Sequence, residues 1–536
     1  MKHVKQLLSA LLVLAVVLSL LPAGVLKASA AEAPAALDIG YPTFKNTELL
    51  DEVYDLSKLG VSYSEKDIMM AIYKQDLANG GDSFYMDRIL AREGVCNGNA
   101  GSNGNADGNT FLTRGRALYM YTSSPSVIGF GGNTAYHQPL GRGDLVRILF
   151  SNADGSLTTK EDTSKRVNAP SNWSSTYSVG SNLTLDIVKF IHQENVAVTT
   201  MTLTNKSAED QAITVAADST FATEPGKVTV NGAEQTELTG TCSSPAGLTT
   251  IYARMTGDGF EAASSDDYCW LSRDVTVPAG GSVELKVVIA FTTEEIPEST
   301  AQYLRFAGLG NLEAVRAQKA EYNLYWAENL PYIDVPKKAV QKAIDYRWWL
   351  ERFNSLDANI PGYDYQYPVT IEGVLGYNNA IILTQPMHLQ DTKWLRSPYL
   401  AYGQLLSAGN SSQSSAFLDN PGNRNNWNNH YGQYLAEAGY EAFNVIGGGA
   451  EAAENFAYYF GHDATGQLEH YGNHIEGRDL IAYRNNYMTG NDADTISMHA
   501  PGTGTWKAHG ENAYVWAAAD AAAKLYEQLG NTEQAK

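Results

Sequence analysis

The spacing of apolar residues changes once along the chain, near Thr300, and this change limits the folds that the chain can adopt. Between about Leu37 and Thr293, short apolar segments rich in β-branched residues run with a period near two. The segments 186–191, 196–203 and 282–290 are the clearest. Turn-forming pairs such as Asn231-Gly232 separate them. Many short strands at this spacing predict a large antiparallel β-sandwich.

After Thr300 the apolar residues follow helical spacing. The pattern predicts helices over 301–329 and 337–354, and about six helical stretches between there and Lys536. Long loops rich in Asn, Gly, Tyr and Trp connect them. We therefore divide the chain into a leader at 1–30, a sandwich domain at 31–299, a helical linker at 300–334 and a helical domain at 335–536.

The first 30 residues have the pattern of an export signal. Lys2 and Lys5 precede an apolar stretch over 7–21, and Ala28-Ser-Ala30 forms a small-residue cleavage site. No later stretch approaches the ~18 apolar residues of a membrane span. We expect cleavage after Ala30 and a soluble protein that is secreted from the cytoplasm.

The charge of the chain excludes some partners. It has 38 Lys and Arg against 59 Asp and Glu, a net charge of −21. Phosphate binding normally requires clustered basic residues, so we expect neither nucleic acid nor an anionic membrane as a partner. The 32 tyrosines and the low charged fraction of 18% fit sugar-stacking surfaces and an ordinary Tyr-rich sandwich equally well.

The cysteines and histidines give little sign of a metal site. Of Cys96, Cys242 and Cys269, the last two could form a disulfide in an oxidising compartment, or all three could be buried thiols. His470 and His474 have zinc-ligand spacing, but Gly472 and Asn473 between them disfavour the helix that would bring them together. We predict neither a metal nor a cofactor.

A polar turn in the helical half has the composition of a sugar subsite. Asp391, Lys393 and Trp394 are predicted to open a helical stretch over 391–406, broken at Pro398, with His388 in the same turn. Charged groups bind sugar hydroxyls, and an indole stacks on the apolar face of the ring. The alternative is a helix-capping Asp391 with a salt bridge beside it.

Two more loops carry candidate binding residues. Segment 370–379 contains Glu372 and Tyr377, and segment 417–430 contains Trp427 among several asparagines. Those asparagines either shape turns and cap helices or line a polar pocket around the indole. We include Glu372, Tyr377 and Trp427 among the predicted substrate-binding residues.

The loop over 483–495 carries the candidate catalytic acid. Hydrolysis of a glycosidic bond needs one carboxylic acid to protonate the leaving oxygen and a second carboxylate to activate water or attack carbon. Asp492 follows a Gly490-Asn491 turn and has Asp494 two residues away, a like charge that would raise its pKa. A turn-forming aspartate is the alternative for Asp492. Glu511, at the start of the next predicted helix, is a further substrate-binding candidate.

At these residues the chain resembles the helical-barrel glycosidases related to glycoside hydrolase family 63, the mannosylglycerate hydrolase and processing α-glucosidase type. The resemblance covers roughly 335–536 and implies an (α/α)6 barrel of six helical hairpins, preceded by a β-sandwich. The family's acid lies in a Gly-Met-Asp-Asn-Ser-like loop, which 489–494 resembles. The match implies that Asp492 is the acid; since Asn491 replaces the Met and Asp494 is an addition, Asp494 is the alternative. The turn over 388–394 resembles the family's Trp-Asp turn at the first subsite, with the Trp displaced.

The family's catalytic base is expected late in the barrel, in its last helices. Six hairpins need about twelve helices, and the sequence predicts six or seven before Lys536. We therefore expect an incomplete barrel that carries the acid, with a base that could lie beyond Lys536. Within this sequence, Asp391, Glu372 and Glu511 are the fallback candidates for the base.

These observations predict a secreted glycoside hydrolase that cleaves an oligosaccharide or polysaccharide at a chain end, with inversion. Two other functions fit the layout. A polysaccharide lyase of helical-toroid type would need a Tyr, His or Lys base and a cationic cleft, which the acidic composition disfavours. A catalytically incomplete carbohydrate-binding protein would use Trp394, Trp427 and the tyrosine-rich loops.

Overall fold

The structure is a computed structural model of the whole chain. It describes residues 33–40, 42, 110–111, 121–122, 128–131, 144–168, 171–219, 221–243, 250–265, 268–292, 297–331, 333, 335–337, part of 340–352, 355–356, 367–370, 380–412, 415–418, 432–470, 482–483, 507–508 and 512–536.

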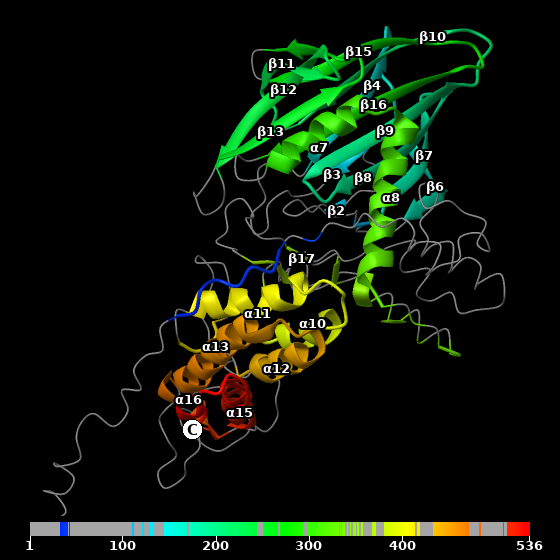
Figure 1. Cartoon of the computed structure of the whole chain (residues 1–536). Coiled ribbons are helices and arrows are strands. Elements are labelled where there is room, and N and C mark those ends of the chain that lie inside the picture. Colours follow the sequence, from blue (N-terminus) through cyan, green and yellow to red (C-terminus); the bar gives the residue numbers. More distant parts are fainter. Residues whose placement is uncertain are drawn as a thin grey trace, which may run out of the picture.

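Two antiparallel sheets form the N-terminal half (Figure 1). The first has the order β14-β15-β10-β4-β3, with β5 paired to β4, and the second the order β11-β12-β13-β16-β9-β8-β7-β6. The strands of the first are β3 (Gly129–Gly131), β4 (Asp144–Asn152), β5 (Gly155–Ser156), β10 (Gln211–Asp218), β14 (Glu261–Ser264) and β15 (Cys269–Val277). Those of the second are β6 (Thr159–Asn168), β7 (Trp173–Val179), β8 (Leu183–His192), β9 (Val196–Asn205), β11 (Glu224–Val230), β12 (Ala233–Ser243), β13 (Thr250–Gly257) and β16 (Ser282–Thr292).

The alternating sequence pattern produces this arrangement. Along β7, buried and more exposed residues alternate, so one face contributes Trp173 and Tyr177 to the core between the sheets. Asn231 and Gly232 both have positive φ, 49° and 80°, as the two-residue hairpin turn between β11 and β12 requires. The predicted strands at 186–191, 196–203 and 282–290 are confirmed within β8, β9 and β16.

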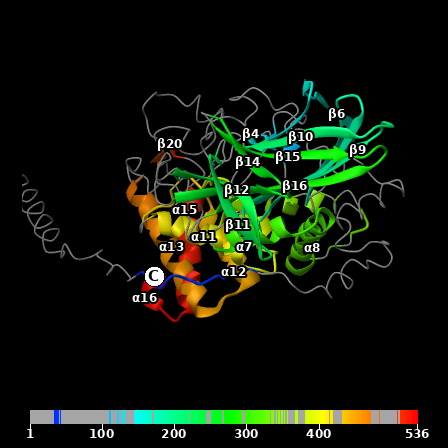
Figure 2. The same cartoon turned by 90° about the horizontal axis from the view of Figure 1, so that it is seen from above.

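Two helices cover the outer face of the eight-stranded sheet. They are α7 (Pro297–Gly308) and α8 (Asn311–Asn329), and Figure 2 shows them on the opposite side of this sheet from β10 and β15. Tyr303 and Phe306 of α7 are fully buried against Phe190, Val198 and Val288 of the sheet. The period change near Thr300 therefore marks the passage from the sheet to the helices that cover it.

The C-terminal half is helical. Its helices are α10 (Gln385–Thr392), α11 (Tyr399–Ser412), α12 (Leu435–Ile446), α13 (Gly449–His470), α15 (Asn512–Gln528) and α16 (Thr532–Ala535), and parts of 340–352 are also helical. Leu405, Phe456, Phe460 and Leu525 belong to its common core. Among the described helices, none has both the length and the apolar character needed to cross a bilayer. A sheet half followed by a helical half is confirmed, and closure into a barrel stays a prediction.

Two details differ from the sequence-based predictions, and a third concerns an alternative that they left open. Asp391 is the penultimate residue of α10, which ends before Pro398, so it does not open a helix. Residues 33–40, assigned to the sandwich domain, contact the helical half instead: Leu37 lies in its core, and Tyr367 Oη donates to the Leu37 carbonyl oxygen at 3.2 Å. Of the two possibilities left open for the cysteines, the structure shows Cys269 as a free, half-buried thiol.

The described residues also form three short antiparallel strand pairs. They are β1 (Thr110–Phe111) with β2 (Tyr121–Thr122), β17 (Ser355–Leu356) with β18 (Val369–Thr370), and β19 (Ala482–Tyr483) with β20 (Lys507–Ala508). The last ladder brings together the two ends of the segment that carries Asp492 and Asp494.

Candidate functional site

The predicted sugar subsite lies at the C-terminal end of α10, where this helix contacts the helical residues of 347–352. Arg347 pairs with Asp391, and Glu351 pairs with His388. Because the partners follow opposite orders along the two segments, the segments run antiparallel. Trp348 Nε1 adds a 3.3 Å bond to the Asp391 carbonyl oxygen. The sequence did not predict this pairing, since the partners are about 40 residues apart.

The pair of His388 and Glu351 is mostly buried. The imidazole N–H at Nδ1 donates to Glu351 Oε1 over 2.7 Å, and the side chains are 17% and 8% exposed. Within the described part of the chain, the second oxygen of Glu351 is buried and makes no hydrogen bond. The same holds for both amide atoms of Gln385, one helical turn before His388. Buried polar atoms normally have partners, so the Glu351 carboxylate and the Gln385 amide, which lies at the start of α10, have unmet hydrogen-bonding capacity.

Asp391 is held by an ion pair. Arg347 donates to its two oxygens from Nε at 3.2 Å and Nη2 at 2.5 Å, and this hydrogen bonding raises the pKa of the guanidinium. A carboxylate in the last turn of a helix opposes the helix dipole, and the forked contact with Arg347 offsets this cost. The alternative to a sugar subsite was a helix-capping Asp391 with a salt bridge beside it. The salt bridge is present, but Asp391 does not cap the start of a helix.

Lys393 connects the same turn to α12. Its Nζ lies 3.0 Å from Glu441 Oε2 and also donates to Gln390 Oε1. Gln390 Nε2 donates to the same Glu441 oxygen at 2.9 Å. The bonds from Gln390 and Lys393 lower the pKa of Glu441. The indole of Trp394 is 53% exposed, with Lys393 Nζ 5.6 Å from its ring centre. The structure thus places a solvent-facing aromatic ring beside a fixed polar cluster.

A buried carboxylate, Asp463 of α13, was missed by the sequence analysis. It accepts hydrogen bonds from the Phe417 backbone N–H at 2.8 Å, Gln433 Nε2 at 3.0 Å and Gln467 Nε2 at 2.9 Å. Burial raises its pKa to about 6, against the opposing effect of these bonds. The available signal was an acidic residue in helical register with Phe456 and Phe460 on the apolar face of α13.

Asp463 fixes both ends of the predicted Trp427 loop. Phe417 and Gln433 flank this segment, and Gln433 Oε1 also accepts the Leu435 backbone N–H at 2.5 Å. One carboxylate therefore connects the chain before the loop, the chain after it and α13. Trp427 itself lies outside the described residues.

The remaining predicted site residues also lie outside the described parts of the chain. They are Glu372, Tyr377, Asp492, Asp494 and Glu511. Their roles stay predictions, and His388, Asp391, Lys393 and Trp394 are the candidates that the structure brings together. In the described residues, no group of three His, Cys, Asp or Glu side chains has a geometry suited to a metal ion.

No protein-family model matches the sequence. Among solved structures, the chain is similar to a proposed kojibiose phosphorylase from the human microbiome, with a TM-score of 0.46, 10% identity, and 66% of this chain and 56% of that one covered. It is also similar to the family GH92 inverting mannosidase BT2199 of Bacteroides thetaiotaomicron VPI-5482, with a TM-score of 0.43, 13% identity, and coverage of 80% and 58%. The family GH92 α-mannosidase BT3965 of Bacteroides thetaiotaomicron follows, with a TM-score of 0.36, 11% identity, and coverage of 78% and 57%. The chain thus spans less than two thirds of the length of each of these proteins.

Proposed function

We propose that the protein is a secreted glycoside hydrolase that cleaves an oligosaccharide or polysaccharide at a chain end, with inversion. The observation that carries this proposal is the cluster at the end of α10. There the indole of Trp394 is 53% exposed and lies beside Lys393, whose Nζ is 5.6 Å from the ring centre and 3.0 Å from Glu441 Oε2. An indole face stacks on the apolar face of a sugar ring, and polar atoms at its side bind the hydroxyls.

Asp492 is proposed as the general acid, with Asp494 as the alternative. The resemblance of 489–494 to the acid loop of family 63 supports this assignment. Inversion requires a second carboxylate about 6.5–9.5 Å from the acid, with a water between them. Asp391 is a poor candidate for this base because both of its oxygens accept hydrogen bonds from Arg347. Of the fallback candidates within this sequence, Glu372 and Glu511 remain.

The test compares Asp492→Asn with Asp494→Asn on a panel of aryl glycosides and short oligosaccharides. If Asp492 is the acid, Asp492→Asn lowers kcat by at least about 100-fold, while Asp494→Asn retains most of it. The circular dichroism spectrum should stay unchanged in both. If Asp494→Asn lowers kcat more than Asp492→Asn does, Asp494 is the general acid. Equal activity in both variants and the wild type rejects the loop as the source of the acid.

The same assays separate the alternatives. An unsaturated, ultraviolet-absorbing product would indicate a polysaccharide lyase, and binding without product at enzyme excess would indicate a carbohydrate-binding protein.

The proposed export is checked separately. Protein recovered from the culture medium should begin at Ala31. A protein that stays inside the cell with its leader still attached would contradict the proposed export.

A further inference from the structure

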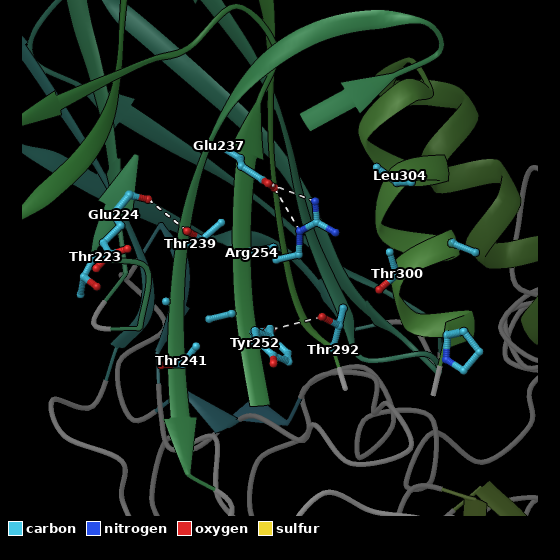
Figure 3. Close-up of a pocket in the computed structure, with 14 residues that line it drawn as sticks. Thr223, Glu224, Glu237, Thr239, Thr241, Tyr252, Arg254, Thr292, Thr300 and Leu304 are labelled. Carbon is cyan, nitrogen blue, oxygen red and sulfur yellow. Dashed lines mark hydrogen bonds and ion pairs between the residues drawn. The ribbon is translucent and has the colours of Figure 1, made fainter. Parts of the chain in front are cut away.

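A groove lies on the outer face of the eight-stranded sheet, between β12, β13 and α7 (Figure 3). Its volume is about 960 Å³. Leu238 and Met255 point into the sandwich core, so the residues next to them along β12 and β13, such as Glu237 and Arg254, face α7. The groove is thus formed by the sheet on one side and by Thr300 and Leu304 of α7 on the other.

A buried ion pair forms one part of the wall. Arg254 donates to Glu237 from Nε at 3.1 Å and from Nη2 at 3.0 Å, and Tyr303 Oη donates to Glu237 Oε2 at 3.0 Å. The Glu237 side chain is only 5% exposed, so its charge needs these partners. The Arg254 guanidinium also lies over the Tyr303 ring, 5.0 Å from its centre. These contacts hold the guanidinium in one orientation.

The guanidinium of Arg254 still has N–H groups that can donate hydrogen bonds to a ligand. Within the part of the chain that the structure describes, Arg254 Nη1 makes no hydrogen bond, and the Arg254 side chain is 22% exposed. A pre-oriented donor of this kind binds a ligand oxygen with little loss of side-chain entropy.

The rest of the lining is rich in hydroxyl groups and includes one aromatic ring. Five threonines line it: Thr223, Thr239, Thr241, Thr292 and Thr300. The hydroxyls of Thr239 and Thr292 donate to the backbone oxygens of Glu224 and Tyr252 at 3.4 Å, so these two can offer a ligand only acceptor lone pairs. Tyr252 is 37% exposed and supplies the ring. The volume lies within the range of pockets that enclose small organic ligands.

The charges of the groove exclude an anionic ligand. Among the described residues that line it, the charged ones are Glu224, Glu237 and Arg254, and Arg254 is already paired with Glu237. A phosphate, sulfate or uronate would need more cationic donors than this. Threonine hydroxyls, a fixed N–H donor and an exposed ring suit a neutral ligand with many hydroxyls and apolar ring faces.

We propose that this groove binds a segment of a neutral oligosaccharide or polysaccharide, an inference that rests on the proposed function for the class of substrate. It holds the carbohydrate on the sandwich half through Tyr252, Arg254 and the threonines. A polypeptide ligand would use the hydroxyls equally well, but it gains less from a flat aromatic ring, and β12 and β13, which form most of the wall, are both paired on each side.

Affinity gel electrophoresis of the whole chain tests the proposal. The gels contain a soluble neutral α-glucan, a mannan, a xylan or, as a polypeptide probe, gelatin. Tyr252→Ala removes the ring, and Ala301→Trp fills the groove from an exposed position of α7 without disturbing the ion pair. Tyr268→Ala is the control, because Tyr268 is a 49% exposed tyrosine outside the groove.

The wild type and Tyr268→Ala should be retarded by at least one neutral polysaccharide, and both groove variants should bind about tenfold more weakly. Three results overturn the proposal: no retardation of the wild type, retardation only by gelatin, or equal retardation of the wild type and both groove variants. If Trp394→Ala were the one substitution that abolished retardation, the binding site would lie at α10 instead.

Hydrolysis of small glycosides is measured in parallel. Retardation without hydrolysis contradicts the proposed function and leaves the groove in place, and the reverse result contradicts only the groove.

Discussion

At the scale of single residues, the buried Asp463 carboxyl makes the stability of the protein depend on pH. Burial raises its pKa from 3.8 to about 6. The folded protein therefore holds the proton more tightly than the unfolded chain does. The resulting stabilisation is fully present below about pH 4 and is lost as the pH rises through about 6. At about 1.4 kcal/mol per pKa unit, the loss is about 3 kcal/mol.

Urea unfolding of the wild type and of Asp463→Asn between about pH 4 and pH 7 measures this effect. The free energy of unfolding of the wild type should fall relative to that of the variant as the pH rises through this window. The variant carries a constant offset, because its amide nitrogen replaces one acceptor oxygen. A difference between the two proteins that does not change with pH would show that Asp463 does not titrate there.

The exposed indole of Trp394 gives a second prediction at this scale. If it stacks on a sugar ring, Trp394→Ala should raise KM about tenfold with a smaller effect on kcat, because the stacking is present in both the bound ground state and the transition state. Trp516→Ala is the matched control, since Trp516 is 69% exposed on α15. Steady-state kinetics on one glycoside compare the two variants. Equal KM values for Trp394→Ala and Trp516→Ala would show that Trp394 does not contact the substrate.

At the scale of elements, the helices of the C-terminal half approach closely at glycines. A Cβ atom added to Gly439 of α12 would lie 2.5 Å from Phe460 Cζ and 2.8 Å from Leu405 Cδ2. Gly439→Ala should therefore destabilise the helical half by about 1–3 kcal/mol, because overpacking outweighs the gain of about 1 kcal/mol in helix propensity.

Gly461→Ala in α13 is the matched control. The nearest atom to its added Cβ is Ala522 Cβ at 3.9 Å, an ordinary contact distance, so only the propensity gain applies. Differential scanning calorimetry should show a lower Tm for Gly439→Ala and an unchanged or higher Tm for Gly461→Ala. A higher Tm for both would mean that α12 and α13 are less closely packed than the structure shows.

The strands and helices also show how much of the fold could be predicted from the sequence. The strands were found because alternation along one chain segment identifies a half-buried sheet, as in β8 and β16. The start of α10 was missed because Pro386, in the first helical turn, was not read as a start signal. The contacts of Asp463 could not be predicted, since its donors Phe417 and Gln433 lie 46 and 30 residues away.

At the scale of the whole molecule, several contacts connect the sheet half to the helical half. Arg352 lies 3.9 Å and 3.8 Å from the ring centres of Tyr322 and Tyr325 of α8. Asn329, the last residue of α8, accepts hydrogen bonds from the backbone N–H groups of Arg396 and Ser397 at 2.8 Å and 2.9 Å. The turn that presents Trp394 is thus held by the helix that also covers the sheet (Figure 1). Composition and periodicity predict the two halves, but not the side-chain contacts that position the site.

The central claim is hydrolysis of a glycosidic bond with inversion, and proton NMR of the reaction in progress tests it most directly. Incubation of the wild-type chain with α- and β-linked glycosides should produce a free sugar whose first-formed anomer is opposite to that of the substrate. The signal of the other anomer should appear only later, at the rate of mutarotation. Retention of configuration would contradict the inverting mechanism. An alkene proton signal, or no product from any glycoside with a cooperatively folded protein, would contradict the assignment as a glycoside hydrolase.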